Sequence, residues 1–214
     1  MDARLEAKLV RTARQQVGNQ DPAHDFLHSL RVLGNAKMIS QKEGGDLDII
    51  IPSALFHDIV AYPKDHKLAR TSAKRSALKT AKILNKIPSF PRDKTLLVCE
   101  VIERVSFTSG KAQDSLEAKI IYDADKLEAT GAISIMRTFA STGQMRRPFY
   151  HLVDPFKESA RKPEALKFAL DLFFTRLLVV EKKMHTKTAK QIARTRTDFL
   201  KKFLEQLRQE LAAS

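Results

Sequence analysis

The stretch IIIPSALFHDIV, residues 49–60, places a histidine beside an aspartate in an otherwise strongly apolar segment. A helix this apolar is expected to be buried on most sides. Burying His57 and Asp58 together is costly unless they pair or bind a metal. Adjacent side chains diverge by about 100° around a helix axis, so the two converge only near a helix end. Pro63 is expected to end this helix a few residues after the His-Asp pair. The alternative is a buried ion pair.

A second polar pattern precedes it in DPAHDFLHSLRV, residues 21–32. The Asp-Pro pair at its start is typical of a helix N-terminus, with Asp as N-cap and Pro in the first turn. The predicted helix runs from there to the Gly-Gly pair after residue 43. His24 and His28 are four residues apart and share a face, and Asp25 is three residues from His28. The alternative is a solvated polar stripe, or histidines satisfied by hydrogen bonds.

A third pattern, DADKLEATGAISIMR at residues 123–137, places acids inside an apolar helix predicted over roughly 115–140. Asp125 and Glu128 share one face of this helix. Gly131 permits another helix to approach closely. The alternative for this motif alone is an acidic cap on a surface helix.

Taken together, the three patterns supply two imidazoles and two carboxylates, a mixture that suits a divalent ion such as Mn, Fe, Ni, Co or Mg. The order His…His-Asp…Asp resembles the HD-domain superfamily of metal-dependent phosphohydrolases. The likeness is carried by the segments at 21–32, 54–64 and 123–137. It is closest to a bacterial subfamily of small, stand-alone hydrolases, and it continues more loosely through residues 185–206.

The resemblance implies four metal ligands, which are His28, His57, Asp58 and Asp125. It also implies that His24 and Asp25 support these ligands or act in catalysis. Members of the closest subfamily hydrolyse nucleoside triphosphates, some with release of pyrophosphate, so a nucleotide substrate is expected.

Two further features bear on the resemblance. Val105 stands where relatives often carry a histidine, so that group is absent or supplied elsewhere. No histidine lies between His66 and His151, the region from which two-metal relatives draw additional ligands. A single divalent metal ion is therefore predicted.

Charge spreading over phosphoryl oxygens in the transition state calls for nearby cations. The predicted substrate-binding residues are Lys64, Arg75, Lys126, Glu128, Arg146 and Arg147. Glu128 would orient a ligand or bind sugar hydroxyls, and the two adjacent arginines would close over phosphates as a lid. His66 is either a general acid or base or an exposed loop residue. Each basic residue has the alternative of being a solvated surface group.

Helical periodicity recurs along the chain, so an all-α fold is predicted: a single HD-domain helical bundle with a C-terminal helical extension. One domain is expected over residues 1–214. It comprises an HD core at about 21–140, an irregular loop at 141–163 and C-terminal helices at 164–212. Shorter helices are expected at 2–16, 48–59, 72–86 and 93–105, and the C-terminal pair at 164–184 and 187–212.

The formal net charge is +13, which favours an anionic partner. Nucleotides or other phosphoesters fit, and cyclic nucleotides, alarmones and monophosphates stay open as alternatives. A nucleic-acid-binding role is the rival from another class. Aromatic residues make up only 7% of the chain, Trp is absent, and no nucleic-acid motif is present, so that role is not favoured.

The single cysteine, Cys99, excludes an internal disulfide and fits a reducing cytoplasm. No run of about 18 apolar residues indicates a transmembrane helix, so no membrane association is expected. The N-terminus also lacks the pattern of a signal peptide. The last helix carries an apolar face that would pack internally or form a homodimer, and both a monomer and a homodimer are left open: Phe199, Phe203, Leu207 and Leu211.

Overall fold

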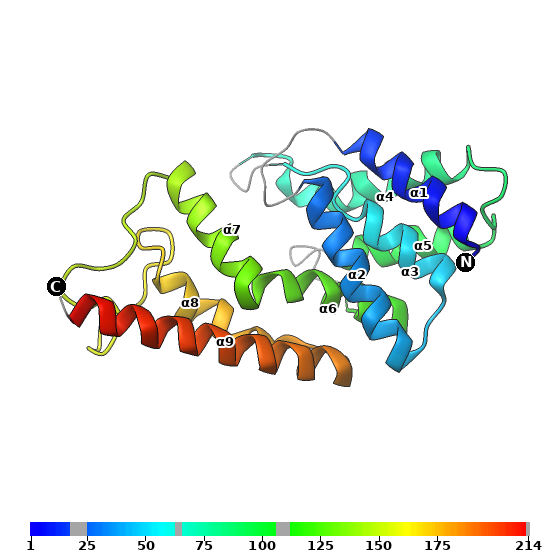
Figure 1. The fold of residues 1–214 in the computed structure, drawn as a ribbon. Coiled ribbons are helices and arrows are strands. Elements are labelled where there is room, and N and C mark those ends of the chain that lie inside the picture. Colours follow the sequence, from blue (N-terminus) through cyan, green and yellow to red (C-terminus); the bar gives the residue numbers. More distant parts are fainter. Residues whose placement is uncertain (18–24, 63–65, 106–111, 213–214) are drawn as a thin grey trace. The chain divides into compact units, whose positions relative to one another are not determined.

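A computed structural model describes residues 1–17, 25–62, 66–105 and 112–212. These residues form helices and contain no β-strand, which confirms the all-α prediction (Figure 1). They fall into two compact units, Met1–Asp125 and Lys126–Ser214. The expectation of one domain over the whole chain stays a prediction. In the described part of the chain, no helix combines the length and the apolarity needed to cross a bilayer.

The first unit is built around α3, Leu47–Phe56, in which every residue from Ile49 to Phe56 is buried. The apolar sequence explains this position, because a helix without a polar face must be enclosed on all sides. Four helices contact it: α1 (Ala3–Gln16), α2 (Phe26–Glu43), α4 (Ser72–Leu84) and α5 (Lys94–Val105). The last helix of the unit, α6, is Leu116–Lys126 and ends at the unit boundary.

Two aspartates cap helices at positions that differ from those predicted. Asp25 has an extended backbone (φ −80°, ψ 177°), and its carboxylate accepts the backbone N–H of His28 at 2.7 Å. Helix α2 begins at Phe26, and the Asp-Pro pair predicted as its start lies outside the described residues. Asp46 caps α3 by accepting the Asp48 N–H at 2.8 Å, so this helix begins one residue before the predicted start at residue 48. In each case the capping carboxylate satisfies an N–H that the helix leaves unpaired.

The prediction of one helix over 115–140 is wrong, because α6 is followed by a 3-10 turn, Leu127–Ala129, and a separate helix α7, Gly131–Gln144. Thr130 is extended at the break, and Gly131 has φ +63°, a conformation that side chains disfavour. A Cβ at Gly131 would also lie 3.2 Å from Cγ of Arg196. The glycine thus turns the chain and admits Arg196 at the same point.

After the 3-10 turn and α7, the described residues of the second unit contain three more helical segments. They are α8 (Asp171–Thr175), the 3-10 helix η4 (Leu177–Lys183) and α9 (Lys187–Ala212). The predicted continuous helix at 164–184 is therefore wrong, whereas the predicted last helix is confirmed. Helix α9 contacts both α7 and η4.

Helix α9 buries a single stripe spaced three or four residues apart, as expected for one face of a helix. The stripe consists of Ala189, Ala193, Thr197, Leu200 and Leu204. The apolar face predicted for this helix is only partly used: Phe203 stacks on Phe173 with ring centroids 5.8 Å apart, whereas Phe199 is exposed.

Candidate metal centre

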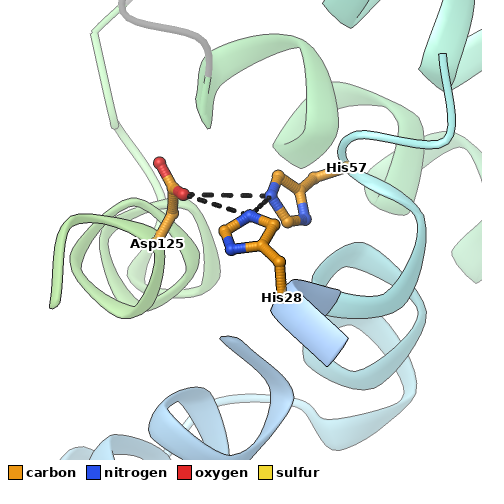
Figure 2. Close-up of side chains that lie close together, drawn as sticks. All are labelled: His28, His57 and Asp125. Atoms are coloured by element: carbon orange, nitrogen blue, oxygen red, sulfur yellow. Dashed lines mark hydrogen bonds and ion pairs between the residues drawn. The ribbon is translucent and has the colours of Figure 1, made fainter. Parts of the chain in front are cut away.

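Two histidines from different helices meet inside the first unit (Figure 2). The Nε2 atoms of His28 and His57 lie 3.3 Å apart, and the exposed fractions of the two residues are 0% and 4%. His28 lies in the first turn of α2, where the Asp25 cap fixes the helix start. His57 is the C-cap residue of α3, which confirms that the His-Asp pair stands at a helix end.

The tautomer of His57 follows from its other ring nitrogen. Nδ1 lies 2.9 Å from the carbonyl oxygen of Ala54. A carbonyl oxygen only accepts hydrogen bonds, so Nδ1 carries the proton and Nε2 presents a lone pair to the cluster. Metal-binding histidines are oriented in the same way, by donating their second ring N–H to a carbonyl or carboxylate.

Two carboxylates complete the cluster. Oδ2 of Asp58 lies 3.8 Å from Nε2 of His28 and 3.6 Å from Nε2 of His57. Oδ1 of Asp125, which comes from α6, lies 3.6 Å and 3.9 Å from the same two nitrogens (Figure 2). The structure therefore brings together all four residues that the sequence predicts as ligands. We call these four residues the His–Asp cluster.

The separations between these atoms fit a shared cation. Two ligand atoms held about 2.1 Å from one ion are about 3.0 Å apart at a right angle and about 4.2 Å apart when opposite. The five separations range from 3.3 to 3.9 Å and lie inside that interval. Two nitrogen and two carboxylate donors match the preferences of Mn, Fe, Ni and Co. His28, His57 and Asp125 thus fit one divalent ion, and Asp58 lies beside both histidines as a further carboxylate.

Burial is uneven across the cluster. Both imidazoles are shielded from solvent, whereas the side chains of Asp58 and Asp125 are 30% and 21% exposed. The cluster is consequently open to solvent on its carboxylate side. Water and a substrate can approach there, while the packed histidine side keeps the donor atoms in place.

Asn35 supports this arrangement and was not singled out from the sequence. Its buried side-chain amide donates to the carbonyl oxygen of Ala124 at 3.2 Å, next to Asp125 in the chain. This bond attaches the end of α6 to α2. The available signal was its place seven residues after His28, two turns along the same helix face.

Several other predicted site residues have definite surroundings in the first unit. His24 and Lys64 lie outside the described residues. Arg75 donates to the hydroxyl of Tyr62 at 3.1 Å and lies over its ring. The Tyr62 ring stacks on His66, with centroids 4.9 Å apart. Arg75 and His66 are thus exposed polar groups in contact with one aromatic ring of the segment that follows Asp58.

Two predicted substrate-binding residues, Lys126 and Glu128, follow Asp125 in the chain and belong to the second unit. Glu128 is buried, and its Oε2 lies 3.8 Å from Nη1 of Arg137. Arg196 donates to the carbonyl oxygen of Leu127, and burial lowers the pKa of its guanidinium. The turn after Asp125 is therefore bound by α7 and α9 side chains.

The predicted lid arginines also lie in the second unit. Arg147 donates to the hydroxyl of Thr142 at 3.1 Å and to the carbonyl oxygen of Ala165 at 2.6 Å. Burial lowers the pKa of this guanidinium. Arg146 is exposed and has φ +49°. Arg147 therefore stabilises its own loop, and the role of both residues at a substrate stays a prediction.

Comparison with known proteins places this geometry in a family. The HD domain family matches residues 25–130. The uncharacterised protein YpgQ of Bacillus subtilis is 30% identical over 213 residues, which is 96% of this chain and 94% of YpgQ. The chain therefore belongs to the HD-domain superfamily of hydrolases, as the order of its histidines and aspartates indicates.

Solved structures extend the likeness over the whole length. YpgQ in complex with ADP matches with a TM-score of 0.72 at 26% identity, covering 96% of this chain and 97% of that one. An HD-superfamily hydrolase from Bacillus thuringiensis matches with a TM-score of 0.75 at 28% identity, covering 99% and 98%.

Proposed function

We propose that this protein is a metal-dependent phosphohydrolase that acts on nucleotides, with nucleoside triphosphates as the first candidates. The observation that carries the proposal is the convergence of His28, His57 and Asp125, with Asp58 beside both histidines; the separations from the two Nε2 atoms are 3.3 to 3.9 Å. The nucleotide is supported by the related YpgQ, whose structure is a complex with ADP. One divalent ion, of Mn, Fe, Ni, Co or Mg, is the proposed cofactor.

A divalent ion bound here would supply Lewis-acid activation of water and of a phosphoryl oxygen. His28 and His57 provide buried nitrogen donors, and the hydrogen bond from His57 to Ala54 keeps one of them in its ligating tautomer. Asp58 and Asp125 provide carboxylates whose combined charge balances a divalent cation. Because these two are partly exposed, a phosphate group would approach from their side.

Other residues of the chain would bind and orient the substrate. Arg75 is proposed to neutralise phosphoryl oxygens, and its contact with Tyr62 restricts the direction of its guanidinium. Asp25 holds the start of α2 in place, and with it His28. We retain Asp25 and His24 as candidate proton-transfer groups. The proposed further substrate contacts are Lys64, Lys126, Glu128, Arg146 and Arg147.

The test is hydrolysis of a panel of nucleoside mono-, di- and triphosphates and cyclic nucleotides with Mn, Mg, Co or Ni, with products resolved by chromatography. The wild-type protein is expected to release pyrophosphate or phosphate from at least one triphosphate. His57→Ala should abolish both this release and metal retention without unfolding the chain, since ligand loss removes the cation. His185→Ala, which removes an exposed histidine outside the cluster, is the matched control and should behave as wild type.

Two results would contradict the proposal. A His57→Ala protein that keeps its metal and its full rate would refute the cluster as the reaction centre. A wild-type protein with metal bound that turns over no nucleotide would refute the nucleotide substrate and leave another phosphoester for the same site.

A further inference from the structure

A second charged feature of the first unit lies on α1 and α4, away in sequence from the His–Asp cluster. A groove of about 370 Å³ is lined there by lysines from both helices. Lys8 comes from α1, and Lys79, Lys82 and Lys86 come from α4 and the residues just after it. Ile83 and Ile87 also line the groove. We call these six residues the lysine groove.

Lys79 and Lys82 share one face of α4, because they are three residues apart, and Lys86 lies just after the end of this helix. Like charges this close repel one another, and a bound anion would relieve that repulsion. None of the described residues that line the groove is acidic. The ammonium group of Lys79 reaches the carbonyl oxygen of Gln16 in α1 at 3.5 Å, which links the two walls.

The sequence around the groove also lacks acids. From His66 to Arg92 the chain has eight lysines and arginines and no aspartate or glutamate. Residues 7–17, which contain most of α1, likewise hold three basic residues and no acid. The local charge is therefore more one-sided than that of the chain as a whole, in which 38 basic residues face 25 acidic ones.

These features select a ligand class. Lysine ammonium groups bind phosphate as point charges. Lys79, Lys82 and Lys86 extend from α4 past its last residue, so together they can contact more than one phosphate. The groove volume is in the range of small-molecule sites, about 300–1,000 Å³. None of the described lining residues is aromatic, so stacking of nucleobases is not provided.

We propose that the lysine groove binds an oligophosphate of about triphosphate length, either inorganic or as the phosphate chain of a nucleotide. It is a second anion site that shares no residue with the His–Asp cluster. Its occupancy needs no metal at the cluster, so the site stands or falls independently of the proposed hydrolysis.

The experiment is calorimetric titration of the full chain with inorganic tripolyphosphate in excess EDTA. The groove variant is Lys79→Ala/Lys82→Ala/Lys86→Ala, in which alanine favours the helix. The control, Lys187→Ala/Lys190→Ala/Lys202→Ala, removes the same charge from exposed positions of α9. The groove variant should bind at least about tenfold more weakly, because charge-assisted hydrogen bonds are lost, while the control stays close to wild type. Circular dichroism checks that both variants keep wild-type helicity.

Further titrations sharpen the result. Lys8→Ala alone, on the opposite wall, should weaken binding several-fold. Equal affinity for ATP and tripolyphosphate would mean that the phosphate chain alone is recognised, whereas tighter ATP binding would add a nucleoside contact at Ile83 and Ile87. Equal losses in the groove and control variants, or no wild-type binding, would overturn the proposal. Tighter binding of a single-stranded oligonucleotide, lost in the groove variant, would replace the small ligand with a nucleic acid.

Discussion

Each unit of the molecule contains one cluster in which aspartates lie among buried groups, and the two clusters differ in what faces the carboxylates. In the first unit, Asp58 and Asp125 face the Nε2 atoms of two imidazoles. In the second unit, the carboxylates face a guanidinium instead of imidazoles. We call this second cluster the arginine clip, and it consists of Asp154, Arg161 and Asp171.

The arginine clip is closed by the protein itself. Nη1 and Nη2 of Arg161 donate to the two carboxylate oxygens of Asp171 at 2.6 and 2.7 Å, in a bidentate pair. Nη2 also donates to the carbonyl oxygen of Asp154 at 2.9 Å. Burial alone would raise the pKa of Asp171, but the hydrogen bonds from Arg161 and the Glu164 N–H hold it below its ordinary value.

The comparison separates two uses of the same residue types. A guanidinium in a bidentate pair satisfies a buried carboxylate permanently and stabilises the loop that leads into α8. An imidazole nitrogen whose lone pair points into the cluster can bind a metal ion but cannot neutralise a carboxylate. Aspartates beside such nitrogens therefore complete a ligand set for a cation from solution. The first arrangement stabilises the fold, and the second is the one that we propose binds a metal and supports catalysis.

The largest expected effect is a loss of activity on replacing a residue of the His–Asp cluster. Asp125→Asn keeps the side-chain shape but removes one anionic ligand, so nucleotide hydrolysis should fall by more than about 100-fold, beyond the loss typical of a residue that only supports a ligand. The free energy of unfolding in EDTA should change by no more than about 1 kcal/mol, because two nearby carboxylates repel without a cation. The measurements are kcat/KM with Mn and urea unfolding. A strongly destabilised variant would mean that the cluster serves folding, like the clip.

The sequence indicated that the four residues of the His–Asp cluster would lie close together, because each of the three segments that carry them puts a costly polar group into an apolar surrounding. His57 and Asp125 each lie in an apolar run, where burying a polar group costs free energy unless the group contacts a partner or a metal. The all-α class followed for a similar reason, since helical periodicity is repeated in nearly every segment.

Other features depend on contacts that have no local pattern. The break at Gly131 was missed, since a glycine between helical patterns reads as a tolerated helix residue until Arg196 is known to lie against it. The clip was missed because Arg161 and Asp171 are ten residues apart with no helical phase between them. The role of Asp25 as a cap depends on where α2 starts, and helix boundaries are the least certain part of a sequence pattern.

The second expected effect is a loss of stability, and it tests whether the arginine clip contributes to folding and not to activity. Asp171 has an exposed fraction of 0%, so Asp171→Asn leaves the partly buried Arg161 without its counter-charge. Removing one member of a buried pair costs about 3–5 kcal/mol. The melting temperature should fall by roughly 6–20 °C, at about 2–4 °C per kcal/mol for a chain of this size. Activity per folded molecule, measured well below that temperature, should stay at the wild-type value.

The double replacement Asp171→Leu/Arg161→Met is the matched control for charge. It removes both members of the Arg161–Asp171 pair, so part of the lost stability should return, while Asp154 loses the charge of Arg161 but keeps its hydrogen bonds from Glu158 and Ser159. If the loss of unfolding free energy in the double variant equals the summed losses of Asp171→Leu and Arg161→Met measured singly, then packing, and not charge balance, makes the clip stabilising.

The smallest expected effect is the pH dependence that Asp154 contributes. The Ser159 hydroxyl hydrogen bond, the backbone N–H groups of Glu158 and Ser159, and Arg161 together lower the pKa of Asp154 to about 2. A carboxyl with a lowered pKa in the folded state stabilises the protein above its unfolded pKa, about 3.9, and loses that contribution as pH falls toward the folded value.

Asp154→Asn should therefore lower the urea midpoint at pH 6, and its difference from wild type should shrink between about pH 4 and pH 2. Asp198→Asn removes an exposed aspartate of the same unit and should track the wild type throughout. A difference that stays constant down to pH 2 would mean that Asp154 acts through the shape of its hydrogen bonds and not through its charge. Only the Arg161–Asp171 pair would then stabilise the clip through its charges. The comparison with the His–Asp cluster would be between that one buried ion pair and one set of metal ligands.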